Sequence, residues 1–249
     1  MGWLDFLKMK PEVVEDLDLS WLGTDMHSHL IPGIDDGSKT MEESLSLLQR
    51  MESFGLKKVI TTPHIMSEYY RNTPEIIQLG LEDLQKAARE AGIKLEIQAA
   101  AEYYMDEIFL EKVKNEEKLL TFGDNYILVE TGFINKPQML LEIIFHLEMA
   151  GYKPVYAHPE RYQYLLTDKK LLEDLLERKL IFQMNLLSLT GFYSKPVKDF
   201  AEMLLEREAV SFLGTDCHNP RYLDMLESLP RNQKIYSKIR QMEWINSTL

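Results

Sequence analysis

Histidines in this chain fall where short apolar runs, the candidate β-strands, come to an end. The chain has six histidines, and five of them stand at or just after such ends: His27, His29, His64, His158 and His218. Carboxylates stand at the same places: Asp25, Asp35, Asp36, Glu102, Glu130 and Asp216. Imidazole nitrogens together with carboxylate oxygens suit Zn²⁺, Mn²⁺ or Fe²⁺ better than Ca²⁺ or Mg²⁺, which favour all-oxygen shells. The residue types therefore predict a metal centre.

The chemistry of such a centre is hydrolytic. Several divalent cations held close together lower the pKa of a bridging water, so that a hydroxide exists at neutral pH. That hydroxide can attack the phosphorus of a phosphate ester in line with the leaving oxygen. We therefore interpret the chain as a metal-dependent phosphate-ester hydrolase.

The spacing of the candidate ligands supports a shared site. His27 and His29 are two positions apart on a strand, so their side chains point to the same face. Asp216 and His218 repeat this arrangement on the last strand. If the first and last strands are neighbours, these two pairs converge. Further ligands from the strands between them are Glu102, Glu130 and His158.

Two residues are set apart from the centre. His146 lies inside the apolar helical run PQMLLEIIFHLEMAG and is interpreted as structural. Cys217, the single cysteine, is followed by HNPR and so lacks the Cys-x₅-Arg spacing of cysteine-dependent phosphatases. Its side chain should point away from those of its two neighbours, which predicts packing and not nucleophilic attack. One cysteine excludes an internal disulfide and fits a reducing compartment.

The elements that must position these residues alternate regularly. Strands are predicted at 23–28, 57–62, 93–101, 125–129, 153–157, 180–185 and 209–215. Helices follow these strands. The first is predicted to begin with a capping box of Thr40 and Glu43 and to stop at Gly55. The second is predicted to begin at the cap residue Thr73 and to end near Gly92. The later helices are predicted at 106–115, 137–150, 168–179 and 195–208, and 222–246 is predicted to be mostly helical.

Seven strand–helix units predict parallel strands with right-handed crossovers, and we expect a single-domain (β/α)₇ barrel. Its chemistry should lie at the carboxyl ends of the strands. The expected division is an N-terminal extension over 1–22 and a catalytic barrel over 23–249. An amphipathic segment in the extension, with Trp3, Leu4, Phe6 and Leu7, is expected to pack on the body.

The net charge and the lack of long apolar runs limit the partners that the chain is expected to bind. The 28 basic and 40 acidic residues give a formal charge of −12, which argues against non-specific binding to nucleic acid or anionic membrane. No run approaches the ~20 apolar residues of a membrane span, and no signal peptide is recognisable. We expect a cytoplasmic protein that is not an integral membrane protein.

Five motifs carry a resemblance that covers about residues 23–225. They are DMHSHLIPGIDDGSKTMEES, TTPH, AAAEYY, AHPERY and GTDCHN. In this order they resemble the polymerase-and-histidinol-phosphatase (PHP) superfamily, and within it the bacterial capsular-polysaccharide tyrosine phosphatases of the CpsB/YwqE type. The resemblance implies a distorted (β/α)₇ barrel with three divalent metals, usually manganese, with iron or zinc as alternatives. It also implies activity on phosphotyrosine in proteins, in capsule or exopolysaccharide regulation.

The resemblance implies a role for each matching position. One metal would be held by His27, His29, Glu102 and Asp216. A second would use Glu102, Glu130 and His158, with Glu102 as the bridge, and a third Asp36, His64 and His218. The substrate arginines would be Arg161 and Arg221. Arg221 stands on a shorter loop than the family pattern suggests, and an ion pair with Glu160 is the structural alternative for Arg161.

Several alternatives stay open from the residues. Tyr69, Tyr70, Tyr103 and Tyr104 either line an aromatic substrate pocket or frame the core. The function could also be that of a small-molecule phosphatase of the histidinol-phosphate type or of a PHP-type nuclease, although the acidic charge counts against nucleic acid. A non-catalytic protein with structural metals is a further alternative. The expected partner is a phosphotyrosine protein, with a bacterial tyrosine kinase as the candidate.

Overall fold

The computed structural model describes residues 17–229 and 234–249, and its strands form two sheets in which all neighbours are parallel. The smaller sheet has the order β1-β2-β4, with β1 (Thr24–Asp25), β2 (Lys58–Thr61) and β4 (Glu96–Ala99). The larger has the order β3-β5-β6-β7-β8-β9, with β3 (His64–Ile65), β5 (Glu102–Tyr104), β6 (Tyr126–Glu130), β7 (Lys153–Ala157), β8 (Ile181–Asn185) and β9 (Phe212–Gly214).

Two of the predicted strands are each divided into two shorter ones. The chain leaves the strand conformation at Thr62-Pro63 and at Ala100-Ala101, and resumes it at His64 and Glu102. Pro63 has no N–H to donate to a neighbouring strand, which explains the first break. The amide of Glu102 still donates to the carbonyl oxygen of Pro63 at 3.1 Å. The breaks therefore turn both candidate ligands into the first residues of new strands.

The strands do not form the single closed sheet that a barrel requires, so the described chain is a mixed α/β fold with two parallel sheets. One parallel bridge, between Ser28 and Cys217, joins the segments that follow β1 and β9. The amide of His29 donates to the Cys217 carbonyl oxygen, and the amide of Asp216 donates to that of His27. The first and last strands are thus neighbours at their carboxyl ends, as the spacing argument required.

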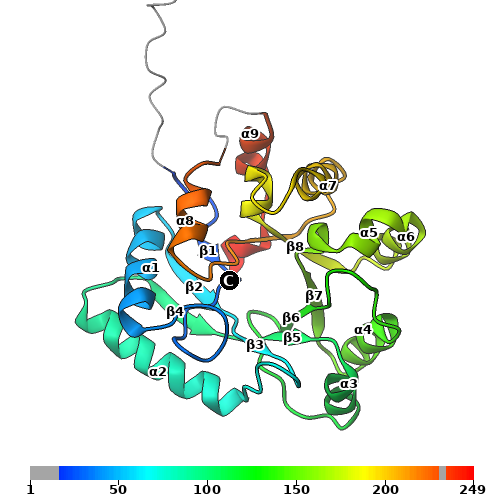
Figure 1. Cartoon of the computed structure of the whole chain (residues 1–249), viewed down its shortest axis with the longest axis horizontal. Coiled ribbons are helices and arrows are strands. Elements are labelled where there is room, and N and C mark those ends of the chain that lie inside the picture. The colour runs from blue at the N-terminus through cyan, green and yellow to red at the C-terminus, as the bar shows by residue number, and fades with distance from the viewer. Residues whose placement is uncertain (1–16, 230–233) are drawn as a thin grey trace, which may run out of the picture.

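Helices surround the strands, in chain order from α1 to α7 (Figure 1). They are α1 (Met41–Ser53), α2 (Pro74–Glu90), α3 (Glu107–Lys114), α4 (Leu140–Met149), α5 (Gln163–Thr167), α6 (Lys169–Glu177), α7 (Lys195–Glu206), α8 (Pro220–Leu226) and α9 (Lys234–Gln241). Short 3₁₀ helices are η2 (Pro159–Arg161), η3 (Leu186–Thr190) and η4 (Ile245–Thr248). Thr40 and Thr73 cap α1 and α2 through their side chains, as predicted. α8 returns beside α1, where Arg50 pairs with Asp224 at 2.7 Å.

Two apolar clusters stabilise this arrangement. The larger packs the helices against the strands, and the smaller draws its members from strands of both sheets: Met26, Ile60, Ala100, Phe122, Leu128, Val155, Ala157 and Phe212. Ile245 and Leu249, at the C-terminal η4, pack against the smaller cluster. Buried Asn246 of η4 donates to the carbonyl oxygens of Thr24 and Leu213 and accepts from the amide of Leu213. η4 therefore links β1 to β9 at the end of the strands away from the histidines.

Several predicted boundaries differ from the structure. The segments after β7 and β8 contain η2, α5 and η3, which the sequence reading left without structure because they are too short for periodicity to show. Leu17, Leu19 and Leu22 of the predicted extension are buried in the larger cluster. The division at residue 22 stays a prediction, and the amphipathic segment with Trp3 lies outside the described residues. Among the residues described, no helix combines the length and apolar character needed to cross a membrane.

Candidate metal centre

All nine predicted metal ligands come together, with His64 and Glu102 as the first residues of β3 and β5 and the others at or after the carboxyl ends of β1, β6, β7 and β9. Their side chains form four overlapping groups, in each of which the ligand atoms lie within 4.8 Å of one another. These groups are His29, Asp36, His64 and His218; His27, His29 and Asp216; His27, Glu102 and His158; and His64, Glu102 and Glu130. All except Asp36 are buried. So many ionisable side chains are not buried together unless something compensates their charges.

Glu102 lies at the middle of the cluster. Its Oε2 is 3.2 Å from His27 Nε2 and 3.3 Å from His64 Nδ1, while its Oε1 is 3.1 Å from His158 Nε2. The carboxylate thus faces His27, a predicted ligand of the first metal, and His158, a predicted ligand of the second. A carboxylate that bridges these two metals must face both. Burial raises the pKa of Glu102, but the nearby imidazoles of His27 and His64 outweigh it, so the pKa lies well below the usual range.

His27 and His29 each present Nε2 to the cluster. Their two Nε2 atoms are 3.4 Å apart, and Asp216 Oδ1 lies 3.3 Å from that of His27 and 3.5 Å from that of His29. Each ring is fixed through its other nitrogen, because His29 Nδ1 bonds Asp35 Oδ2 at 2.8 Å and His27 Nδ1 donates to Gln183 Oε1 at 2.9 Å. Hydrogen bonding of one nitrogen leaves the other available for a cation.

Strand β8 supplies a relay of amide side chains that the sequence reading missed. Gln183 accepts from His27 and donates through Nε2 to Asn185 Oδ1 at 2.9 Å. Asn185 then donates to Asp216 Oδ2 at 2.7 Å. Both amides are buried. The relay thus sets the tautomer of one candidate ligand and the orientation of another, and its only sequence signal was the buried Gln-Met-Asn pattern in a predicted strand.

Asp35 and Asp25 have supporting positions and do not face the cluster. Asp35 bonds His29 and accepts from the amides of Gly37 and His64. A Cβ on Gly37 would lie 2.2 Å from the His29 carbonyl oxygen, so only glycine fits this turn. Asp25 accepts from the amide and hydroxyl of Thr215, which joins β1 to β9. Burial raises the pKa of Asp25 to about 6 despite these bonds.

Three buried atoms of the cluster have no hydrogen-bond partner among the described residues: His64 Nδ1, Glu130 Oε1 and His158 Nδ1. His64 Nδ1 and Glu130 Oε1 are 2.9 Å apart without the geometry of a hydrogen bond. Burial lowers the pKa of His64, but Glu130 and Glu102 outweigh it and raise the pKa to about 10. An imidazole nitrogen and a carboxylate oxygen that face each other without a hydrogen bond are atoms that a cation would satisfy, so His64 and Glu130 fit a divalent metal ion.

The cluster meets solvent at Asp36. The side chain of Asp36 is 50% exposed, and its Oδ1 lies 3.4 Å from His64 Nε2 and 3.5 Å from His218 Nε2. His218 is fixed by donating from Nδ1 to the carbonyl oxygen of Asp216 at 2.8 Å. A substrate phosphate can therefore approach the cluster from this side.

Two candidate ligands sit in the left-handed region of backbone conformation. His158 has φ 34° and Asp216 has φ 52°. Residues other than glycine rarely adopt this region, and when they do at a buried cluster the surrounding structure must hold them there. Gly214 allows the close packing, since a Cβ at this position would lie 2.7 Å from the Cβ of His27.

Arg161 lies beside the cluster. Its Nη1 is 3.0 Å from Asp216 Oδ2, and its guanidinium lies 4.3 Å from the ring centroids of both Phe133 and Tyr193. Burial lowers the pKa of Arg161, but Tyr193 and Asp216 outweigh it, and the group stays charged. It borders a cavity of about 620 Å³ that Phe133, Tyr193 and Gln163 also line. The alternative ion pair with Glu160 is wrong.

Glu160 instead is buried and turns away from Arg161. Its Oε1 accepts from the amide of Asn185 and from the hydroxyl of Ser188. It therefore anchors η3 beside β8.

Arg221 lies at the start of α8, exposed, with its guanidinium 5.2 Å from the ring centroid of Phe192. Phe192 contacts Tyr193 and Tyr222, and Tyr222 stacks on His218 at 5.1 Å. Aromatic rings thus connect Arg221 to the neighbourhood of Arg161 and of the cluster. Among the described residues, no hydrogen bond or ion pair joins Arg221 to a candidate ligand, and its role stays a prediction.

The four tyrosines were predicted either to line a substrate pocket or to frame the core, and they differ in their positions. Tyr103 is buried, and its hydroxyl oxygen accepts from the amide of Leu120, so it belongs to the core. Tyr70 stacks on His64 at 5.5 Å, and Tyr104 is half-buried opposite Glu130 in the sheet register. Tyr69 is exposed. Tyr70 and Tyr104 thus border the cluster.

The two residues set apart from the centre contribute no ligand atom to it. Cys217 is buried among apolar side chains, and burial raises the pKa of its thiol, which makes it a poor nucleophile. His146 lies in α4 and takes part in none of the four ligand groups.

Comparisons with known proteins agree with this site. Residues 23–241 match the family described as capsular polysaccharide synthesis, CpsB/CapC. Tyrosine-protein phosphatase YwqE of Bacillus subtilis is 30% identical over 197 residues, which cover 78% of this chain and 77% of the relative. Tyrosine-protein phosphatase CpsB of Streptococcus pneumoniae is 28% identical over 200 residues, covering 78% and 82%.

A solved structure is similar as well. It belongs to a study of YwqE from Bacillus subtilis and CpsB from Streptococcus pneumoniae, described as unique metal-dependent tyrosine phosphatases. The TM-score is 0.76 at 26% identity, and the match covers 85% of this chain and 87% of the other.

Proposed function

Because the chain belongs to the CpsB/CapC family of capsular polysaccharide synthesis, we propose that it is a metal-dependent phosphomonoesterase that dephosphorylates phosphotyrosine in proteins. The observation that carries the proposal is the convergence of nine imidazole and carboxylate side chains, with Glu102 at their centre and with His64 Nδ1 and Glu130 Oε1 facing each other without a hydrogen bond. Relatives along most of the chain are named tyrosine-protein phosphatases.

We assign the nine residues to three divalent cations, with manganese as the expected ion and iron or zinc as alternatives. His27, His29 and Asp216 would share one cation with Glu102, which would bridge to a second that Glu130 and His158 also hold. Asp36, His64 and His218 would hold the third. Support comes from the four overlapping groups, in which His29 and His64 also lie close enough to reach a second position.

The residues around the cations have separate tasks. Bound cations supply Lewis-acid charge and make a hydroxide available near neutral pH. Arg161, charged and held between two rings, donates to phosphate oxygens that arrive beside Asp216. Arg221 is proposed as a second donor to the phosphate. Attack at phosphorus breaks the bond to the tyrosine oxygen, and the phenolate leaves without a strong general acid.

The proposal has a direct test. The purified protein should hydrolyse a phosphotyrosine peptide, lose this activity in excess chelator and regain it with Mn²⁺. His27→Ala and Asp216→Ala should each lower turnover by more than about 100-fold while the fold is kept. His146→Ala is the matched control and should keep full activity. Full activity in excess chelator would contradict the proposal.

A second candidate is a small-molecule phosphatase of the histidinol-phosphate type, since the metal cluster alone does not choose the leaving group. Rates on histidinol phosphate and on phosphotyrosine peptide distinguish the two. Inertness toward single-stranded DNA would dismiss the PHP-type nuclease. We also propose that a bacterial tyrosine kinase is the protein substrate and that the protein is cytoplasmic.

We further propose that the seven strand positions form a distorted barrel, with β2 and β3 counted as one strand and β4 and β5 as another. The bridge between Ser28 and Cys217, the hydrogen bonds of Asn246 to β1 and β9, and the small apolar cluster shared by both sheets support this.

A further inference from the structure

A second cavity of about 500 Å³ opens beside the metal centre, between α2 and α3. It is lined by the residues that directly follow two candidate ligands: Ile65 and Met66 come after His64, and Tyr104 comes two positions after Glu102. Two residues of extended chain span at most about 7 Å, so the cavity begins within this distance of the cluster. It lies in a different sector of the molecule from the cavity at Arg161, which η2, α5 and α7 border.

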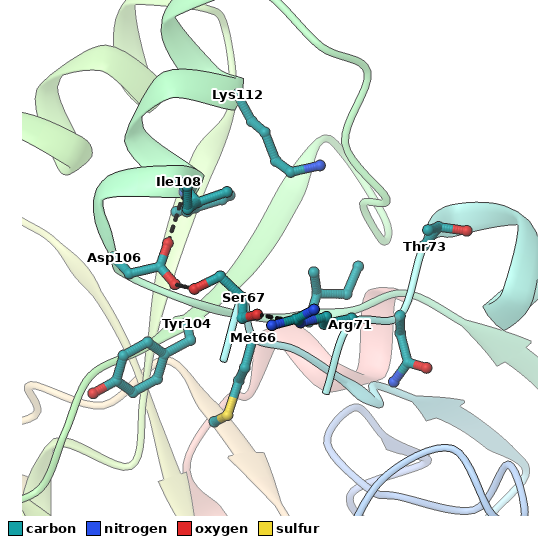
Figure 2. A pocket seen from close by; sticks show the side chains of 11 residues that line it. Met66, Ser67, Arg71, Thr73, Tyr104, Asp106, Ile108 and Lys112 are labelled. Carbon is teal, nitrogen blue, oxygen red and sulfur yellow. Dashed lines mark hydrogen bonds between the residues drawn. The ribbon is translucent and has the colours of Figure 1, made fainter. Parts of the chain in front are cut away.

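The lining combines apolar and basic side chains. Ile108 and Phe109 contribute apolar surface, while Arg71 and Lys112 contribute two positive charges. Figure 2 shows Lys112 on α3 and Arg71 in the segment that leads to α2. Thr73, the N-cap of α2, also lines the cavity, so the positive end of that helix dipole is close.

Asp106, the single carboxylate among the lining residues, already accepts hydrogen bonds from within the chain. Asp106 accepts from the amide of Phe109 at 2.7 Å and from the hydroxyl of Ser67 at 2.5 Å (Figure 2). Arg71 uses Nε for the carbonyl oxygen of Ser67 and forms no ion pair within residues 17–229 and 234–249. Lys112 pairs only with exposed Glu117 at 3.3 Å, a contact that competes weakly with another anion. With Asp106 counted, Arg71 and Lys112 leave the lining with one net positive charge, on a chain of formal charge −12.

We propose that this cavity binds an acidic side chain of the phosphoprotein substrate, two or three residues from the phosphotyrosine. The inference rests on the proposed function, because the phosphotyrosine must occupy the metal centre. Two or three residues of extended peptide span about 7–11 Å, which is enough to reach a cavity whose lining begins one or two residues from the ligands His64 and Glu102. Arg71 and Lys112 bind the carboxylate, while Ile65 and Ile108 accept the apolar part of the peptide.

The experiment compares matched phosphotyrosine peptides on the full, metal-loaded chain. One set carries glutamate two or three residues before or after the phosphotyrosine, and the other carries glutamine at the same position. In at least one register, wild-type kcat/KM should favour the glutamate peptide by about three- to tenfold, through KM. General electrostatics would act the other way, since the whole chain is acidic.

Variants of the lining residues test whether the preference for glutamate peptides arises from this cavity. The double variant R71A/K112A should lower the glutamate-to-glutamine ratio to about one. Its matched control is K86A/R89A, which removes two exposed basic residues of α2 outside the lining and should keep the wild-type ratio. The charge-reversed variant R71E/K112E should prefer a peptide with lysine in that position.

Two failures are distinguishable. Equal rates on both peptide sets in every register, or an unchanged ratio in R71A/K112A, would overturn the cavity assignment and leave the phosphatase proposal intact. If the metal-loaded chain hydrolyses no phosphotyrosine peptide of either set, the proposed function fails and this inference fails with it.

Discussion

At the scale of single residues, the orientation of the ligands depends on side chains that touch no metal position. His27 is held by Gln183, Asp216 by Asn185, and His29 by Asp35. Each of these contacts fixes which atom faces the cluster. Partners of this kind typically change metal affinity or activity by about 10–100-fold when they are removed.

Gln183→Leu tests the amide relay. Leucine keeps much of the side-chain volume, but it cannot accept a hydrogen bond from His27 Nδ1 or donate one to Asn185. The His27 ring is then free to carry its proton on Nε2, the nitrogen that faces the cluster. We expect about 10–100-fold weaker Mn²⁺ binding, measured by titration, with a parallel loss of kcat/KM. The control is Gln98→Leu on β4, whose amide bonds only the neighbouring exposed Glu96. Unchanged metal affinity in Gln183→Leu would contradict a positioning role.

At the scale of elements, the strand breaks and the C-terminal η4 decide how the strand ends meet. The break at Thr62-Pro63 lets His64 enter a separate short strand that pairs with Glu102. At the opposite end, η4 holds β1 and β9 together through Asn246. The strand break and η4 both position segments that neighbour the candidate ligands, so the metal centre depends on parts of the chain that contribute no ligand.

Asn246→Ala tests the contribution of η4. The change removes three hydrogen bonds and leaves the carbonyl oxygens of Thr24 and Leu213 buried without their donor. We expect the free energy of unfolding to fall by about 2–4 kcal/mol, measured by urea denaturation. Thr248→Ala, which removes an exposed hydroxyl of the same helix, should change it by less than about 0.5 kcal/mol. Equal stability of the two variants would show that η4 is not needed to join the strands.

At the scale of the whole molecule, the candidate ligands come from segments spread around the entire circuit of strands. They range from His27 near the start of the described chain to His218 near its end. A cation that binds them binds the folded chain and not the unfolded one, so metal binding and stability are coupled.

Metal removal tests this coupling. At a free Mn²⁺ concentration 100 times the Kd, the folded chain should gain about 2.7 kcal/mol, which corresponds to an increase in Tm of about 5–10 °C for a domain of this size. Differential scanning calorimetry with and without chelator measures the shift. His27→Ala should show a smaller shift than His146→Ala. A Tm that does not respond to Mn²⁺ would contradict a metal centre built from these residues.

The sequence by itself determined the alternation of strands and helices, the caps at Thr40 and Thr73, and a cluster of histidines and carboxylates after the strands. These features follow from local rules: side-chain periodicity, capping chemistry, and the meeting of parallel strand ends at one edge. The choice of nine ligands, without Asp25 and Asp35, came from the family resemblance. The two-sheet arrangement was not predicted, because local sequence does not record whether the chain pairs again with a neighbouring strand after Pro63 or Ala101.

Only the tertiary structure decided the surroundings of those nine residues. It placed Gln183 and Asn185 beneath His27 and Asp216, turned Glu160 away from Arg161, and set Arg161 between Phe133 and Tyr193. The cavity bordered by Arg71 and Lys112 likewise arises from residues about 40 positions apart. Contacts of this kind join residues far apart in the chain, and neither periodicity nor spacing records which of them will touch.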